Sequence, residues 1–173
     1  MPNFQVADIQ ELPFDDATFD LVVANHMLYH VPDLTKALQE VVRVLKVNGR
    51  FCAVTNGATH MQELKLLRAD MLRYVNLPVD NNRLFAQLPF RLENGAALLQ
   101  PWFRQVQFVP FEDSLEVNEV APLIDYAFSA DEYRAILTDE RLSKIRQYVA
   151  DRMTAVGGSI HITKSVGMFV ARK

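Results

Sequence analysis

The feature that most constrains the fold is a strand–helix–strand pattern over residues 19–55. Residues 19–24 (FDLVVA) form a nearly continuous apolar run rich in β-branched side chains, which is typical of strands covered on both faces in parallel sheets. The segment 33–49 carries an apolar stripe at helical spacing, and Asp33 can cap its N-terminus. Residues 50–55 predict a second apolar strand. Because such units are right-handed crossovers between parallel strands, the pattern predicts an α/β sheet.

The boundaries of this unit can also be predicted. The helix is expected to end at Asn48-Gly49, since both residues tolerate the left-handed backbone conformation beyond many helix ends. Lys46 would then lie in the last turn, where a cation complements the helix dipole. Before the first strand, residues 4–7 (FQVA) fit a short strand that ends at Asp8.

Beyond residue 57 helical patterns predominate. Helices are predicted over 60–76, 94–100, 117–128 and 131–156, the last of them broken near residues 138–139. Strands are predicted over 104–111 and 160–173.

The chain has no repeats or linker-like segments, so residues 1–173 are interpreted as a single domain. Its parts are a cofactor-domain half (1–57), a helical insert or lid (58–103) and C-terminal strands and helices (104–173).

Composition excludes several classes of protein. Half of the residues are hydrophobic and 23% are charged, which is typical of a globular protein. Eighteen Lys and Arg residues against 21 Asp and Glu give a net charge of −3, and scattered basic residues argue against nucleic-acid or membrane binding. The single Cys52 excludes an internal disulfide, and no signal-peptide pattern opens the chain, so a cytoplasmic location is expected.

Polar residues follow the first two predicted strands. Asp8 at a strand end can accept a hydrogen bond from an exocyclic amine such as adenine N6, or it can simply cap a turn. Asn25 and His26 come directly after the strand 19–24, at the edge where α/β sheets bind ligands. His26 and His30 have a spacing that could share a metal ion, but no acidic or Cys partner accompanies them, so no metal site is expected.

Other reactive or aromatic residues have a structural alternative. Cys52 lies in an apolar run, where it is expected to pack as a small buried side chain. Phe85, Phe90, Trp102 and Phe103 could line a substrate pocket, although aromatic clusters more often form the core.

Residues 6–55 resemble a known family. "AD" followed by "LPF", then "FD", "LYHV.D" and "E..RVLK..G.F" occur in order over this segment. They closely resemble the second half of the cofactor domain of class I S-adenosylmethionine-dependent methyltransferases, within the small-molecule and ubiquinone-biosynthesis-like group. The resemblance implies the C-terminal part of a Rossmann-like fold, with a mixed, mostly parallel sheet, flanking helices and a helical insert. The family's strand order resembles 3-2-1-4-5-7-6.

The resemblance also implies cofactor-binding residues. Asp8 matches the residue that binds the adenine amino group, and the backbone of Ile9 faces the ring. Leu12 belongs to the loop beneath the adenine. Asn25 and His26 match positions along the methionine end of S-adenosylmethionine and the methyl-transfer site.

His30 matches a frequent histidine of the same segment, so His26 and His30 are the candidate catalytic residues. Glu40, Arg43 and Gly49 match positions that shape the helix and its exit, and we interpret them as structural. The resemblance implies a small-molecule methyl acceptor.

The family's G-x-G-x-G loop and its ribose-binding carboxylate have no counterpart before Asp8; the glycines stand at 49, 57, 95, 157, 158 and 167. The sheet is therefore expected to be incomplete at one flank, as in a truncated product or fragment. The strand 19–24 would be an apolar edge, and we expect a homodimer to cover it, by pairing with a second copy around a two-fold axis. The alternative function is a non-catalytic methyltransferase-like scaffold or partner subunit that has lost cofactor binding.

Overall fold

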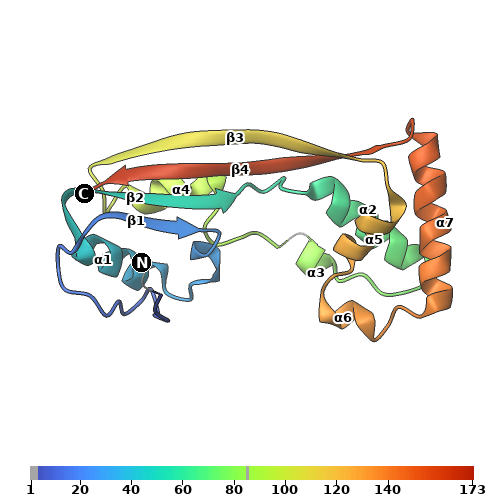
Figure 1. The fold of residues 1–173 in the computed structure, drawn as a ribbon, viewed down its shortest axis with the longest axis horizontal. Coiled ribbons are helices and arrows are strands. Elements are labelled where there is room, and N and C mark those ends of the chain that lie inside the picture. The colour runs from blue at the N-terminus through green and yellow to red at the C-terminus, as the bar shows by residue number, and fades with distance from the viewer. Residues whose placement is uncertain (1–3, 85) are drawn as a thin grey trace. The chain divides into compact units, whose positions relative to one another are not determined.

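A computed structural model describes residues 4–84 and 86–173 of the chain. Its sheet contains four strands in the order β1-β2-β4-β3 (Figure 1): β1 (Phe19–Asn25), β2 (Leu45–Asn56), β3 (Gln105–Val117) and β4 (Ile160–Arg172). Strand β1 pairs with β2 in parallel, and β2 pairs with β4 antiparallel. The order corresponds to strands 4-5-7-6 of the family arrangement. The predicted mixed α/β sheet is confirmed, but the expectation that it is mostly parallel is not, because β2 pairs in parallel with β1 and antiparallel with β4.

The predicted helices are present in the described residues with shifted ends, and two short helices, of residues 28–30 and 81–84, were not predicted. The helices of the described residues are η1 (Leu28–His30), α1 (Leu34–Val44), α2 (Gln62–Tyr74), α3 (Asn81–Leu84), α4 (Leu92–Leu99), α5 (Val120–Ala127), α6 (Asp131–Arg134) and α7 (Asp139–Ala155). The predicted break near residues 138–139 is confirmed, because Thr138 caps α7 by accepting a hydrogen bond from the Arg141 N–H at 3.4 Å. None of these helices is both long and apolar enough to cross a lipid bilayer.

The chain divides into two compact units. The first contains the described residues up to 58 together with 88–112 and 165–173, and the second contains the described residues of 59–87 and 113–164. Helix α4, expected within the insert, belongs to the first unit, whereas α5, α6 and α7 join α2 and α3 in the second.

In the first unit, one face of the sheet is covered and the other is open. Buried strand residues of the covered face pack with α1 and the segment around α4 in one apolar cluster; they include Ala24, Phe51, Ala53, Phe169 and Ala171. On the opposite face of β1, Leu21 and Val23 remain 52% and 51% exposed. The expectation that this strand is covered on both faces is therefore wrong, because the first unit's helices pack on a single face.

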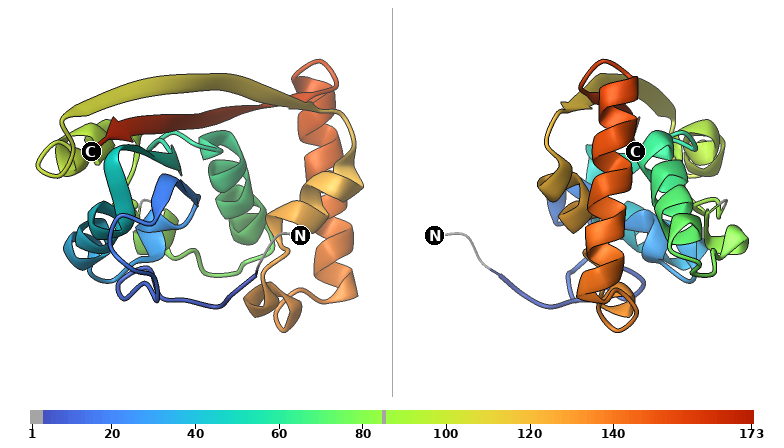
Figure 2. Two further views of the ribbon diagram at one scale, coloured as in Figure 1. Left: turned by 60° about the vertical axis from the view of Figure 1, so that its left-hand side comes forward. Right: turned by 90° about the vertical axis from the view of Figure 1, so that its right-hand side faces the viewer.

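The second unit has a helical core. Helix α7 contacts both α2 and α5 (Figure 2), and the contact is apolar. Met71 of α2, Ile124 of α5 and Ile145 and Val149 of α7 are at most 2% exposed. The unit is thus held by three helices that are distant in sequence.

The end of α1 differs from the prediction. The helix stops at Val44, well before Asn48-Gly49, and Leu45 is already paired with Phe19 in the sheet. The register then shifts before the next pair, and Asn48 adopts a left-handed conformation with φ of 66°. Pairing with β1 therefore overrides the helical pattern of these residues.

Two further expectations are wrong. Lys46 lies outside the helix, and its ammonium group forms an ion pair with the Asp20 carboxylate at 2.8 Å. Residues 4–7 form no strand, and Phe4 and Val6 are 89% and 101% exposed. An extended segment needs a neighbouring strand for its backbone groups, and the described residues offer none here.

Candidate functional site

The candidate site lies where the parallel strands β1 and β2 end. Asn25, the last residue of β1, pairs with Val54, two residues before the end of β2. His26 then donates its backbone N–H to the Val54 carbonyl at 3.0 Å. Its φ of 51° is left-handed, a conformation uncommon for residues other than glycine and often found at functional sites. Both side chains are exposed at the edge.

The turn at residues 8–11 belongs to the same edge. Helix α1 connects two parallel strands, so it must begin at the edge where β1 ends. The N-cap of this helix, Asp33, donates its backbone N–H to the Gln10 side-chain carbonyl at 3.0 Å. This contact attaches the turn to the sheet edge that also carries Asn25 and His26.

Asp8 is exposed, and its carboxylate is held by Gln10. The Gln10 backbone N–H donates to Oδ1 at 2.9 Å, and the Gln10 amide nitrogen lies 3.2 and 3.1 Å from the two oxygens. The backbone hydrogen bond, followed by the side-chain one, lowers the pKa of Asp8 below its ordinary value. The turn-capping alternative is thus realised, while the ionised oxygens keep lone pairs that a ligand donor could use.

Ile9 and Leu12 are half-buried, and α1 fixes the loop that carries them. Ile9 packs against the apolar cluster of the first unit. The Leu12 N–H donates to the Glu40 carboxylate at 2.8 Å, and the Leu12 carbonyl accepts from Arg43 at 3.0 Å.

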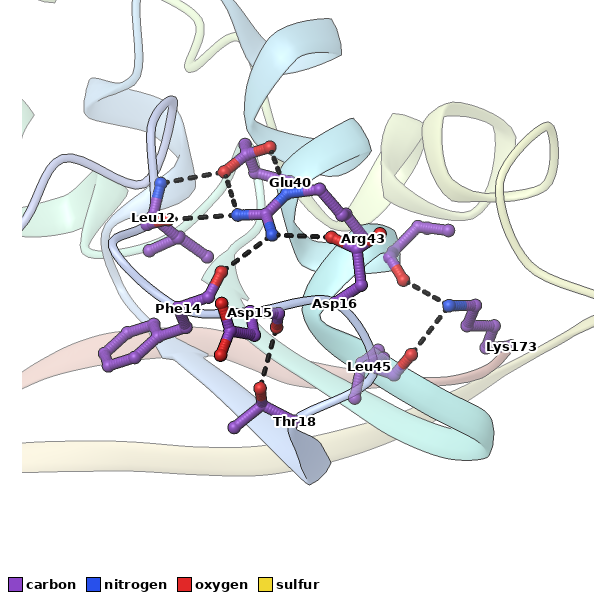
Figure 3. Close-up of polar contacts among 10 residues, drawn as sticks. Leu12, Phe14, Asp15, Asp16, Thr18, Glu40, Arg43, Leu45 and Lys173 are labelled. Carbon is purple, nitrogen blue, oxygen red and sulfur yellow. Dashed lines mark hydrogen bonds and ion pairs between the residues drawn. The ribbon is translucent and has the colours of Figure 1, made fainter.

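Figure 3 shows Arg43 at the centre of this contact. Its guanidinium donates twice to Glu40, at 2.8 and 2.7 Å, and also to the Phe14 carbonyl and the Asp16 carboxylate. Chiefly through the Arg43 hydrogen bond, the pKa of Glu40 falls to about 2, although burial opposes the change. The side chains of Glu40 and Arg43 thus stabilise the loop–helix contact, in agreement with the structural role interpreted from the sequence.

His30 lies on a different element from His26. It ends the short helix η1, its side chain is exposed, and its ring packs edge-on against Tyr29 with centroids 4.5 Å apart. The two histidines therefore do not share an α-helical face. In the described part of the chain, no group of three or more His, Cys, Asp or Glu residues could hold a metal ion.

Sequence reasoning missed Asn56 at the end of β2. Its Oδ1 is buried without a hydrogen-bond partner among the described residues. A buried orphan acceptor next to a ligand edge suits a ligand donor, since leaving it unpaired costs free energy. The sequence contained a signal for Asn56, because this polar residue follows an apolar run in β2, just as Asn25 follows the apolar run in β1.

The remaining candidates are mostly core residues. Phe90 and Phe103 are 0% and 5% exposed and belong to the apolar cluster of the first unit, with Trp102 packed against it. Phe85 lies outside the described residues. Cys52 is half-buried rather than fully buried, because it lies on the open face of the sheet beside Val23.

Comparisons with known proteins find methyltransferases that match the N-terminal third of the chain. The methyltransferase domain family matches residues 2–53. Over 56 residues the chain is 42% identical to the uncharacterized methyltransferase YcgJ of Bacillus subtilis, which covers 32% of this chain and 22% of that protein. Over 49 residues it is 48% identical to the ubiquinone/menaquinone biosynthesis C-methyltransferase UbiE of Rickettsia felis, covering 28% of this chain and 20% of that protein. The matched segments thus span about a fifth of these relatives.

Solved structures share the fold over nearly the whole chain. The crystal structure of Bacillus subtilis YcgJ has a TM-score of 0.53 at 20% identity, covering 98% of this chain and 70% of that one. A putative methyltransferase from an antibiotic biosynthesis pathway of Anabaena variabilis has a TM-score of 0.60 at 16% identity. The match covers 96% of this chain and 72% of that one. Residues 2–53 thus match the methyltransferase domain family, and the strand order agrees with the class I S-adenosylmethionine-dependent methyltransferase fold that the sequence resembles.

Proposed function

We propose that the chain takes part in methyl transfer from S-adenosylmethionine to a small-molecule acceptor. The observation that carries the proposal is that the Asp8 turn, Asn25 and His26 lie at one edge of the sheet. The names of the relatives add support, since YcgJ and UbiE are both described as methyltransferases. A cytoplasmic location remains a prediction from the sequence.

The residues present fit the cofactor in chemical type. In this proposal Asp8 accepts a hydrogen bond from the adenine amine, beside the Ile9 backbone and the Leu12 side chain. Asn25 and His26 bind toward the methionine end, where the orphan Oδ1 of Asn56 offers a further acceptor for an ammonium group.

When bound, S-adenosylmethionine supplies an electrophilic methyl group on its sulfonium. The chain's own part is to orient the acceptor in line with that group and to take its proton. His26 and His30 are the candidates for this base, because a neutral imidazole has a ring nitrogen that can accept a proton.

Binding of S-adenosylhomocysteine, measured by calorimetry, tests the proposal. We expect Asp8→Ala to weaken binding by about tenfold or more, because a hydrogen bond to an ionised acceptor is lost. Asp15→Ala is the matched control, since Asp15 is an exposed aspartate of the same loop and should leave the affinity unchanged. Absence of binding at millimolar ligand would contradict the proposal for this chain.

One observation favours the non-catalytic alternative. The Asp8 carboxylate is already satisfied by Gln10, so the turn is stable without a ligand. A methyltransferase-like scaffold would show no affinity for S-adenosylhomocysteine in the wild type and no difference between Asp8→Ala and Asp15→Ala.

We also propose that a second copy pairs with the free edge of β1. The opposite edge strand, β3, carries Pro110, which lacks an N–H, and the acidic Glu112, both of which hinder strand addition. Strand β1 has no proline, and its one charged residue, Asp20, is paired with Lys46. Antiparallel pairing about a two-fold axis at Val22 would set Leu21 opposite Val23 of the other copy, so that exposed apolar side chains meet.

The oligomeric state tests this pairing. Light scattering at micromolar concentration should report a dimer, and Val23→Lys should convert it to a monomer. Val47→Lys is the control, since Val47 is 71% exposed and lies outside β1. A monomeric wild type would refute the pairing.

A further inference from the structure

The second unit contains a pocket of about 480 Å³ that the methyl-transfer proposal does not use. Part of its lining is apolar and comes from Leu66 and Leu67 of α2 together with Val156 and Ile160. Leu66 and Val156 are 41% and 58% exposed, so the apolar surface reaches solvent. A cavity of this size suits a small ligand with an apolar body.

The carboxylates of the pocket are already satisfied. Glu116 lies 2.5 Å from His161 Nδ1 through Oε1 and accepts from the Ser159 hydroxyl through Oε2 at 3.0 Å. Glu63 accepts from the Thr163 N–H at 3.0 Å and from its hydroxyl at 2.7 Å. All four carboxylate oxygens therefore have a donor within the protein.

His161 is the group left for a ligand. The acceptor carboxylate of Glu116 fixes the imidazole proton on Nδ1, and Nε2 has no hydrogen bond to any residue that the structure describes. In the neutral ring, Nε2 is thus an acceptor. Arg152, the remaining charged residue of the lining, already has partners. Its guanidinium donates to the Tyr148 hydroxyl at 3.3 Å and forms an ion pair with the Asp70 carboxylate at 3.8 Å.

We propose that this pocket binds a phenol, with the phenolic hydroxyl donating to His161 Nε2 and the ring against the apolar side chains. An anionic ligand would meet the negative charges of Glu63 and Glu116. A cationic ligand would compete with the donors that already occupy those carboxylates. A ligand without a hydroxyl would cover Nε2 and leave it unpaired. The site lies entirely within the second unit, so it stands independently of the proposed methyl transfer.

Three ligands of similar shape test the site by calorimetry or NMR titration on the whole chain: para-cresol, toluene and para-toluate. We expect para-cresol to bind about five- to tenfold more tightly than toluene, because it alone makes the hydrogen bond, and more tightly than para-toluate. His161→Phe keeps an aromatic ring at this position but removes Nε2. The variant should therefore bind para-cresol no more tightly than it binds toluene. Unchanged toluene binding shows that the pocket is intact in this variant.

A second variant tests the tautomer. In Glu116→Gln the new amide can donate to Nδ1, which moves the imidazole proton to Nε2 and turns the acceptor into a donor. The preference for para-cresol over toluene should then fall several-fold. The proposal is overturned if para-cresol does not bind at millimolar concentration, if toluene or para-toluate binds equally or better, or if His161→Phe leaves the para-cresol affinity unchanged.

Discussion

Replacing Glu40 by Gln removes the charge on which the contact between α1 and the loop depends. In the wild type, Glu40 accepts the Leu12 N–H and two N–H groups of Arg43, and its side chain is only 19% exposed. The lowering of its pKa from 4.5 to about 2 corresponds to about 3 kcal/mol at neutral pH. Because Arg43 is 31% exposed, water screens part of this, and we expect Glu40→Gln to lose roughly 2 kcal/mol of unfolding free energy.

The loss should depend on pH with a definite sign. A carboxyl whose pKa is lower in the folded state stabilises the fold fully above its unfolded pKa. For Glu40 this contribution is present above about pH 4.5 and disappears as the pH falls towards 2. Glu40→Gln cannot titrate there, so the stability difference from the wild type should shrink over the same range.

Urea unfolding followed by Trp102 fluorescence measures this effect, since the only tryptophan packs against the apolar cluster of the first unit. Urea unfolding curves of the wild type and of Glu40→Gln, at neutral pH and at several pH values below 4.5, give the difference in unfolding free energy at each pH. Glu11→Gln is the matched control, because Glu11 is an exposed glutamate of the same loop and should change stability by less than about 0.5 kcal/mol. A Glu40→Gln protein as stable as the control at neutral pH would refute the reasoning, as would a full difference persisting near pH 2.

Two other substitutions test packing and capping in the first unit. In Gly95→Ala the new Cβ would lie 2.3 Å from the Phe169 ring, so we expect a loss of about 1–3 kcal/mol by urea unfolding, and a neutral result would contradict the close approach. Lys173→Met removes an ammonium group that donates to the carbonyls of Val42 and Leu45 at 2.6 Å, at the end of α1. The substitution should lower the free energy of unfolding by about 1 kcal/mol in the same assay. Amide hydrogen exchange at the end of α1 should become faster, and an unaltered rate would count against the contact.

Sequence reasoning succeeded where local patterns decide the structure. The apolar run of β1, the cap at Asp33 and the break before α7 at Thr138 are each set by neighbouring residues. It failed where distant pairing decides. The pairing of Leu45 with Phe19 ends α1 early, and no pattern within the helix predicts it. The division into two units also depends on contacts between distant segments, which periodicity does not report.

The candidate site was predictable only where local sequence determines it. Asn25 and His26 follow an apolar strand, and that rule places them at the sheet edge, as the structure does. The position of the Asp8 turn depends on the Gln10 contact with α1, which local sequence does not indicate. Whether Asp8, Ile9, Leu12, Asn25 and His26 bind the cofactor stays a prediction until binding is measured.

The strand order has a consequence for how the protein is made. Strand β4, the last in the chain, lies between β2 and β3 rather than at an edge of the sheet. During synthesis β2 therefore waits without its antiparallel neighbour until residues 160–172 have left the ribosome. For all that time one edge of this apolar strand remains unpaired, although β1 can already pair with its other edge, so the nascent chain should depend on chaperones more than its size alone would suggest.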